Sequence, residues 1–214
     1  MRSRFDEQLA QLNREMIEMG AQCEEVIALA SKALTEADMK LAAKVAPLSA
    51  DIDRKEREIE ALCLRLLLQQ QPVARDLRQI SAALKMITDL ERIGDQAEEI
   101  ADIIGFIDGH NPEDYITLTE MAKAAIHMVT ESIDAYVKHD TILAEKVVDE
   151  DNIVDEYFLQ VKSKLIAKIA ENPDDGEYAL DLLMIAKYFE RIGDHAVNIA
   201  EWVIFSVTGV HRGE

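Results

Sequence analysis

The stretch Glu-Arg-Ile-Gly-Asp occurs twice in this chain, at residues 91–95 and again, letter for letter, at residues 190–194. A second match links Ala-Ala-Lys-Val at residues 42–45 to Ala-Glu-Lys-Val at residues 144–147. Self-similarity at a near-constant distance is the signature of a duplicated unit. We therefore predict two similar halves, residues 1–108 and residues 112–209, followed by a tail at residues 210–214.

The amino-acid composition favours helices in both halves. The 214 residues include only 8 Gly and 4 Pro, whereas 49% are hydrophobic and 5% aromatic. From Phe5 through Leu9, Leu12, Met16 and Met19, apolar residues recur in alternating steps of four and three. This spacing predicts one helix of about 30 residues that packs in a bundle.

Turn and capping residues divide each half into three helices. In the first half, Thr35 or Asp38 is expected to cap a second helix that ends near Gln71, and Pro72 to open a third that ends near Phe106. In the second half we expect helices from about Pro112 to Lys138, from Asp140 or Thr141 to about Glu171, and from the turn at residues 172–176 to near Gly209. The predicted fold is all-α, with six long helices in two tandem, pseudo-symmetric three-helix bundles.

The net charge of −19 excludes some partners, since 42 acidic residues face 23 basic ones. Nucleic acid is not expected, because binding it requires a basic surface. No apolar leader opens the chain, and no stretch approaches about 18 uncharged apolar residues, so we expect a cytoplasmic protein without membrane insertion. Cys23 and Cys63 are expected to be buried, reduced thiols.

Carboxylates follow one face of each third helix. The predicted site residues are Glu91, Asp95, Glu98 and Asp102 in the first half, and Glu190, Asp194, Asn198 and Glu201 in the second. Their helical spacing confines them to arcs of about 60° and about 80°. A row of like charges one turn apart is unfavourable unless something neutralises it. Hard cations bound by carboxylate oxygens would do so, including Mg²⁺, Mn²⁺, Ca²⁺ and ferric iron.

Two further features bear on these acidic faces. Asp51, Asp53 and Glu56 on the second helix, and Asp151 and Asp155 on the fifth, can face the acidic faces of the third and sixth helices. The alternative for these five residues is an ordinary solvated position. Gly94 and Gly193 cost helix stability at equivalent positions, which indicates close approach of a neighbouring helix or a ligand. The alternative is an ordinary solvated acidic face, which Arg92 and Arg191 favour because each can pair with acids on its own helix. His195 is expected at the surface or in packing rather than as a metal ligand.

The duplicated motif, its continuations at residues 96–101 and 195–201, and Gln-Pro-Val-Ala-Arg-Asp-Leu-Arg at residues 71–78 together resemble the PhoU family. This resemblance covers nearly the whole chain. It implies two three-helix bundles and, in some members, multinuclear metal clusters held by a Glu/Asp-x-x-x-Asp motif in each half. That motif corresponds to Glu91 with Asp95 and to Glu190 with Asp194. Iron, manganese, magnesium and zinc are the candidate metals. Gln96 departs from the repeat, because the other copy has His195.

The resemblance also implies a function. PhoU-like proteins act with the ATPase subunit of a phosphate ABC transporter and with a sensor histidine kinase, and they restrain the phosphate-starvation response. We therefore expect a metal-binding adaptor that is not an enzyme and forms a homodimer. The alternatives are an accessory protein of a different phosphate carrier and a metal-dependent phosphohydrolase, since clustered carboxylates can hold two catalytic ions.

Overall fold

A computed structural model describes residues 2–70, 73–107 and 112–211, and these residues contain helices and no strand. The helices are α1 (Arg2–Glu36), α2 (Met39–Ala42), α3 (Val45–Gln70), α4 (Ala74–Ile104), α5 (Pro112–Lys138), α6 (Thr141–Glu171) and α7 (Gly176–Thr208), with a 3₁₀ turn at Pro173–Asp175. The all-α prediction with six long helices is confirmed. None of the described helices is long and apolar enough to cross a membrane.

Aspartate caps mark corresponding places in the two halves. The Asp38 carboxylate accepts hydrogen bonds from the backbone N–H groups of Lys40 and Leu41, at 2.8 and 3.2 Å. Asp140 does the same for Ile142 and Leu143, at 3.0 and 3.1 Å. Such caps satisfy N–H groups that have no partner inside the helix.

Two helix starts in the first half differ from the predicted ones or cannot be compared with them. Thr35 is not a cap, because it lies inside α1 and its hydroxyl donates to the Ser31 carbonyl at 2.8 Å. The predicted start at Pro72 lies outside the described residues, and α4 begins at Ala74 with Val73 as its extended N-cap. The predicted break at residues 108–111 also lies outside them.

The predicted continuous second helix is wrong, because it is interrupted between α2 and α3. After one turn the backbone tightens at Lys44, whose N–H donates to the Leu41 carbonyl three residues back. Pro47 provides the reason. In an unbroken helix its ring would clash with the carbonyl of Ala43, whereas in the first turn of α3 it costs nothing. The equivalent residue in the second half is Asp149, and there α6 continues without a break.

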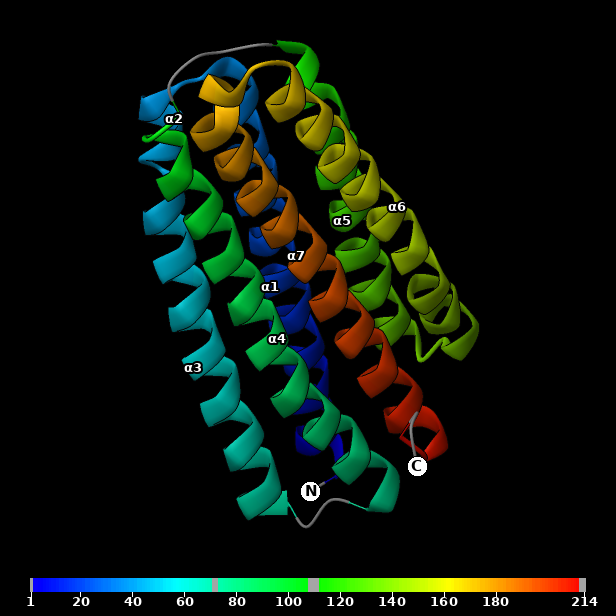
Figure 1. The fold of residues 1–214 in the computed structure, drawn as a ribbon. Helices are drawn as coiled ribbons and strands as arrows, with labels where there is room; N and C mark the ends of the chain where they lie inside the picture. The colour runs from blue at the N-terminus through cyan, green and yellow to red at the C-terminus, as the bar shows by residue number, and fades with distance from the viewer. Residues whose placement is uncertain (1, 71–72, 108–111, 212–214) are drawn as a thin grey trace.

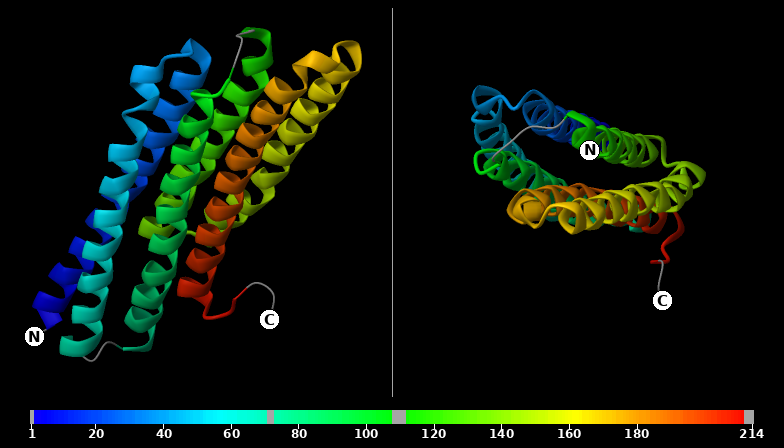
Figure 2. Two further views of the ribbon diagram at one scale, coloured as in Figure 1. Left: turned by 60° about the vertical axis from the view of Figure 1, so that its left-hand side comes forward. Right: turned by 45° about the horizontal axis from the view of Figure 1, so that its top comes forward.

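The two repeats pack side by side around one shared core. Helices α1, α3 and α4 form one repeat and α5, α6 and α7 the other, with α3 and α6 at opposite edges (Figures 1 and 2). Between the repeats, α4 lies along α7 and α1 along α5. The buried apolar residues form a single cluster that includes Cys23 and Cys63, both free thiols. Each acidic helix face therefore meets the outer helix of its own repeat.

Candidate acidic metal sites

A three-carboxylate cluster lies between α3 and α4. Asp53, Glu91 and Asp95 each place one carboxylate oxygen within 4.8 Å of the others, and all three are half-buried. Glu91 and Asp95 come together because they are one turn apart on α4. Asp53 reaches them from α3, as the sequence suggested. The only cation paired with them among the described residues is Arg92, 3.5 Å from Glu91 and 3.4 Å from Asp95.

The first cluster is short of positive charge. Burial raises the pKa of Glu91, and the neighbouring Asp95 raises it further. Burial likewise raises the pKa of Asp95, although Arg92 partly opposes this. One oxygen of Asp53 is buried and accepts no hydrogen bond among the described residues. An unpaired buried acceptor is costly, so this arrangement favours a ligand that brings positive charge.

The second repeat carries an equivalent and more acidic cluster between α6 and α7. It consists of Asp151, Asp155, Glu190 and Asp194, which influence one another electrostatically. It is looser than the first, because no three of these described side chains place oxygens within 4.8 Å of one another. Burial raises the pKa of Asp151 to about 6, and the charges of Asp155, Asp194 and Glu190 raise it as well. Burial and Glu190 raise the pKa of Asp194. Lys187 pairs with Glu190, and one oxygen of Asp151 is buried without a hydrogen-bond partner.

The two motif glycines permit close helix packing at these clusters. A Cβ atom on Gly94 would lie 3.2 Å from Ile52 Cδ1 and 3.5 Å from the Ser49 hydroxyl, both on α3. A Cβ atom on Gly193 would lie 3.2 Å from an Asp151 carboxylate oxygen on α6. The neighbouring helix therefore accounts for the glycines. Close packing also holds the outer-helix carboxylates against the motif acids.

The remaining predicted residues lie along the same helices but outside the close group in the first repeat. Glu98 is half-buried and Asp102 is exposed, and neither belongs to the group of oxygens within 4.8 Å. Glu201 is half-buried on α7. Asn198 instead donates to Asp89 on α4 at 3.1 Å. The structure thus brings Glu91 and Asp95 together with Asp53, which spacing on one helix could not establish.

Asp89 joins the two repeats. Besides the bond from Asn198, it lies 2.9 Å from His195 Nδ1. Across the same α4–α7 interface, the Tyr188 hydroxyl donates to Glu99 at 3.3 Å. Tyr188 and Glu99 are the repeat equivalents of Asp89 and Asn198. His195 therefore serves in packing between helices, as expected, and pairs with a carboxylate of the other repeat.

The donor chemistry of both clusters fits hard cations. Each cluster offers several carboxylate oxygens from two helices, no thiolate, and one buried oxygen without a partner. Oxygen donors of this kind suit magnesium, manganese and iron, and carboxylates also serve zinc. The residues of the motif, extended by Asp53 in the first repeat and by Asp151 and Asp155 in the second, are therefore the candidate metal ligands.

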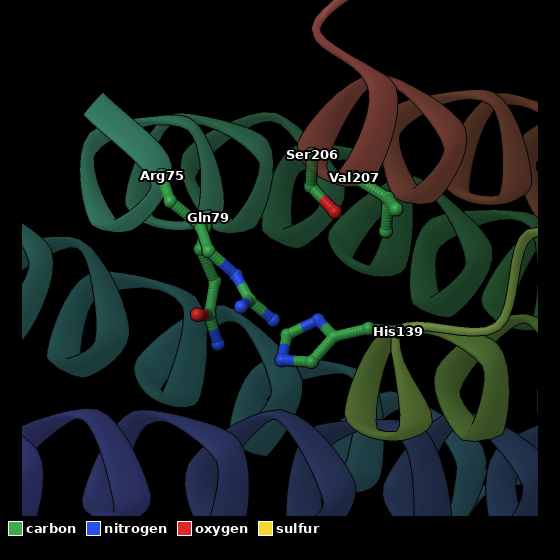
Figure 3. Close-up of a pocket in the computed structure, with 5 residues that line it drawn as sticks. All are labelled: Arg75, Gln79, His139, Ser206 and Val207. Atoms are coloured by element: carbon green, nitrogen blue, oxygen red, sulfur yellow. The ribbon is translucent and has the colours of Figure 1, made fainter.

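Away from the acidic clusters, a pocket of about 320 Å³ lies where three helix ends meet. Arg75 and Gln79 reach it from the start of α4, His139 from the end of α5, and Ser206 and Val207 from the end of α7 (Figure 3). His139 has a left-handed backbone conformation with φ of 53°. The sequence reasoning did not single out this pocket, because its residues lie far apart along the chain.

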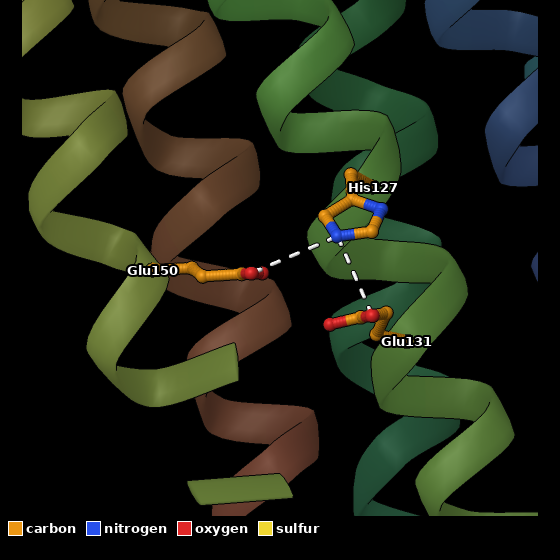
Figure 4. A group of neighbouring side chains, drawn as sticks. All are labelled: His127, Glu131 and Glu150. Atoms are coloured by element: carbon orange, nitrogen blue, oxygen red, sulfur yellow. Dashed lines mark ion pairs between the residues drawn. The ribbon is translucent and has the colours of Figure 1, made fainter. Parts of the chain in front are cut away.

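A third group of possible ligands was also missed. His127 and Glu131, one turn apart on α5, meet Glu150 from α6 (Figure 4). The His127 Nε2 atom lies 3.4 Å from Glu131 and 3.7 Å from Glu150. The i, i+4 spacing of His127 and Glu131 was the available signal. Lys146 already neutralises both glutamates, at 2.7 and 3.2 Å, although one buried oxygen of Glu150 accepts no hydrogen bond among the described residues. This group is therefore an ion-pair network with its own cation.

The fold and the clusters define a class: an all-helical, internally duplicated protein with a carboxylate cluster at an equivalent place in each repeat. Comparison with known families narrows this class. The model of the PhoU domain matches residues 16–104 and again residues 118–203. The chain belongs to the PhoU family.

Individual relatives agree over nearly the full length. A Pseudomonas aeruginosa protein described as "Phosphate-specific transport system accessory protein PhoU homolog" is 35% identical over 207 residues, which cover 96% of this chain and 86% of that protein. A Clostridium acetobutylicum protein of the same description is 33% identical, covering 96% of this chain and 94% of its own length.

Two solved structures share the fold. The crystal structure of PhoU from Pseudomonas aeruginosa superposes with a TM-score of 0.90 at 34% identity, and covers 96% of this chain and all of that one. The phosphate transport system regulatory protein PhoU from Streptococcus pneumoniae gives a TM-score of 0.89 at 25% identity, over 98% of this chain and all of that one. The arrangement of the two repeats is therefore that of known PhoU structures.

Proposed function

We propose that this protein is a cytoplasmic accessory regulator of phosphate uptake. One observation carries the proposal: relatives described as accessory proteins of a phosphate-specific transport system match this chain over nearly its whole length. That description is of an accessory component, which supports a role without catalysis. The match spans both repeats and both copies of the motif, so it covers the residues on which the role would depend.

In this proposal the protein is an adaptor. It binds the ATPase subunit of a phosphate ABC transporter and a sensor histidine kinase, and it restrains the phosphate-starvation response while phosphate is plentiful. The strongly acidic surface supports docking to basic protein surfaces, because complementary charge accelerates and orients association. We also expect the adaptor to be a homodimer.

In this proposal, bound metal has a structural and regulatory role. The first cluster would hold it through Asp53, Glu91 and Asp95, and the second through Glu190 and Asp194 with help from α6. A bound cation supplies positive charge to carboxylates that otherwise repel one another. Binding would join α3 to α4 and α6 to α7, and so would fix the positions of the outer helices.

Elemental analysis with a binding titration tests the metal part. The wild type is expected to hold metal in fixed stoichiometry, and a fourfold variant is expected to lose it while keeping its helicity by circular dichroism. The substitutions in that variant are Glu91→Gln, Asp95→Asn, Glu190→Gln and Asp194→Asn.

A matched control removes the same number and kind of charges from exposed positions. It carries Asp6→Asn, Glu7→Gln, Glu145→Gln and Asp149→Asn, all on exposed side chains. If both variants retain metal, or both lose it equally, the clusters are not the binding sites.

Co-purification with the purified transporter ATPase and with the cytoplasmic part of the kinase tests the adaptor part. Binding to each partner, weakened in the fourfold variant, is the expected result. Failure to bind either partner, with or without added Mn²⁺, would refute the adaptor role. Binding only to a phosphate carrier of another class would assign the protein to that carrier instead.

A further inference from the structure

The pocket between the ends of α4, α5 and α7 is a cationic site in a strongly anionic protein. Arg75 forms no ion pair with any described carboxylate, although the chain carries a net charge of −19. Arg78 stands one turn further along α4, where its Nε donates to the Ser206 backbone carbonyl at 3.5 Å. An unpaired guanidinium beside a pocket favours an anionic ligand.

His139 lies close to the positive charge of Arg75. Burial lowers its pKa, and the positive charge of Arg75 lowers it further, so the imidazole is neutral near pH 7. A neutral imidazole offers one N–H donor and one acceptor nitrogen. Arg75 and His139 approach the pocket from different repeats (Figure 3), so a ligand between them would touch both halves of the molecule.

Polar groups continue behind the pocket wall. Gln79 is 7% exposed and donates to Asn13 on α1 at 3.2 Å. Next to Gln79 lies the Tyr136 hydroxyl, which is buried and interacts with the Gln79 side chain. Gln79 thus connects the pocket lining to polar groups of α1 and α5 in the core behind it.

The duplication shows that the fold does not require these residues. The equivalent pocket at the other end of the molecule is lined by Ala37 where this one has His139, and by Ile107 where this one has Ser206. Ala37 has the same left-handed backbone, with φ of 49°. Two equivalent positions are thus apolar in one copy and polar in the other, which favours a ligand as the reason for the polar lining.

We propose that this pocket binds inorganic phosphate. Its volume of about 320 Å³ suits a small ligand and not a peptide segment. Arg75 would contribute a forked pair of N–H donors and His139 a single one. The Ser206 hydroxyl donates to the Val203 carbonyl at 2.7 Å, so its oxygen is left to accept. Hydrogen phosphate carries an O–H that this oxygen can accept, whereas sulfate does not.

The proposal goes beyond the adaptor role and does not depend on it. A protein without this site can still bind metal and partners through other surfaces. The assignment rests on side chains outside both acidic clusters. Phosphate bound here would contact α4 of one repeat and α5 and α7 of the other, and so would connect the two repeats.

Isothermal titration of the full-length, chelator-treated protein with inorganic phosphate tests the site, since removing metal prevents phosphate from binding through a cation. One phosphate per chain is expected. Arg75→Gln should weaken binding at least about tenfold, because it removes a charge-assisted hydrogen-bond pair. His139→Ala should weaken it several-fold without unfolding the protein, because alanine already holds this backbone at position 37.

Lys123→Gln is the matched control, because it removes one exposed positive charge more than four turns away on α5. It should leave the affinity within about twofold, as expected for a screened surface charge. The proposal would be overturned if titration to about 10 mM phosphate, tenfold above a dissociation constant of about 1 mM, gave neither heat nor a change in the protein's NMR shifts. Equal affinity of the Arg75→Gln variant and the wild type would overturn it as well. Equal binding of sulfate would overturn the role given to Ser206.

Discussion

Asp151 shows how one residue can separate two otherwise equivalent sites. Its counterpart in the first repeat is Ser49, and each lies against the motif glycine of its own repeat. Serine adds a neutral hydroxyl to the first interface, whereas Asp151 adds a fourth carboxylate to the second. The second cluster should therefore be the more sensitive to pH and the more dependent on a cation.

The raised pKa of Asp151, about 6, predicts how stability changes with pH in the metal-free protein. The folded state binds this proton more tightly than the unfolded state, so the carboxylate destabilises the fold above pH 6, and this cost disappears as the pH falls toward 4. Asp151→Asn should therefore raise the free energy of unfolding by about 1 kcal/mol at pH 8 after allowance for solvent screening, and by little at pH 4.

Urea unfolding of both proteins at the two pH values, in the presence of a chelator, measures this difference. Asp149→Asn, an exposed carboxylate on the same helix, is the control and should change stability little at either pH. An equal gain for Asp151→Asn at both pH values would show that its charge is not the cause.

The site was only partly predictable from single residues. Spacing on one helix identified Glu91 with Asp95, and the duplication identified their counterparts. It could not show that Asn198 turns toward Asp89, because that depends on how α4 packs on α7. Nor could it connect Arg75 with His139, which lie in different repeats and become neighbours only through tertiary packing.

At the scale of helices, most boundaries followed from local chemistry. The helix from Pro112 to Lys138 and the one from Thr141 to Glu171 begin and end where predicted, because Asp140 caps one and residues 172–176 interrupt the chain. The break before α3 was missed although its cause, Pro47, is visible in the sequence. The break was missed because the two halves were expected to contain the same helices, and α6 is unbroken.

Close packing of α4 on α3 gives a testable consequence at Gly94. Alanine should gain up to about 1 kcal/mol of helix propensity. However, its Cβ would lie 3.2 Å from Ile52, whose side chain is fully buried, and crowding a packed core costs about 1–3 kcal/mol. Gly94→Ala should therefore lower the free energy of unfolding by about 1 kcal/mol and, by displacing α3, weaken metal binding at the first cluster.

Gly176→Ala is the matched control for this prediction. A Cβ atom at Gly176 meets no atom within 4 Å, so the substitution should be neutral or slightly stabilising. Thermal melts followed by circular dichroism compare the two variants. A Gly94→Ala protein at least as stable as the wild type would mean that Ile52 yields without cost.

At the scale of the whole molecule, the repeats are two sequence units but one packed body. The buried residues form one continuous cluster, in which α4 and α7 share a long interface and α1 packs on α5. This interface also carries the bonds from His195 and Asn198 to Asp89. Neither repeat can bury its apolar face alone. Packing of the repeats against each other buries both faces, and it also fixes the two acidic clusters relative to one another.

A shared core predicts a single cooperative unfolding transition. Two independent bundles would melt separately, whereas loss of one repeat here exposes the core of the other. Calorimetry of the metal-free protein should give equal calorimetric and van't Hoff enthalpies. Asp194→Asn and Asp95→Asn, although they lie in different repeats, should shift the same transition. Two resolved transitions, each moved by only one of these substitutions, would show instead that the repeats unfold independently and that a ligand in one cannot stabilise the other.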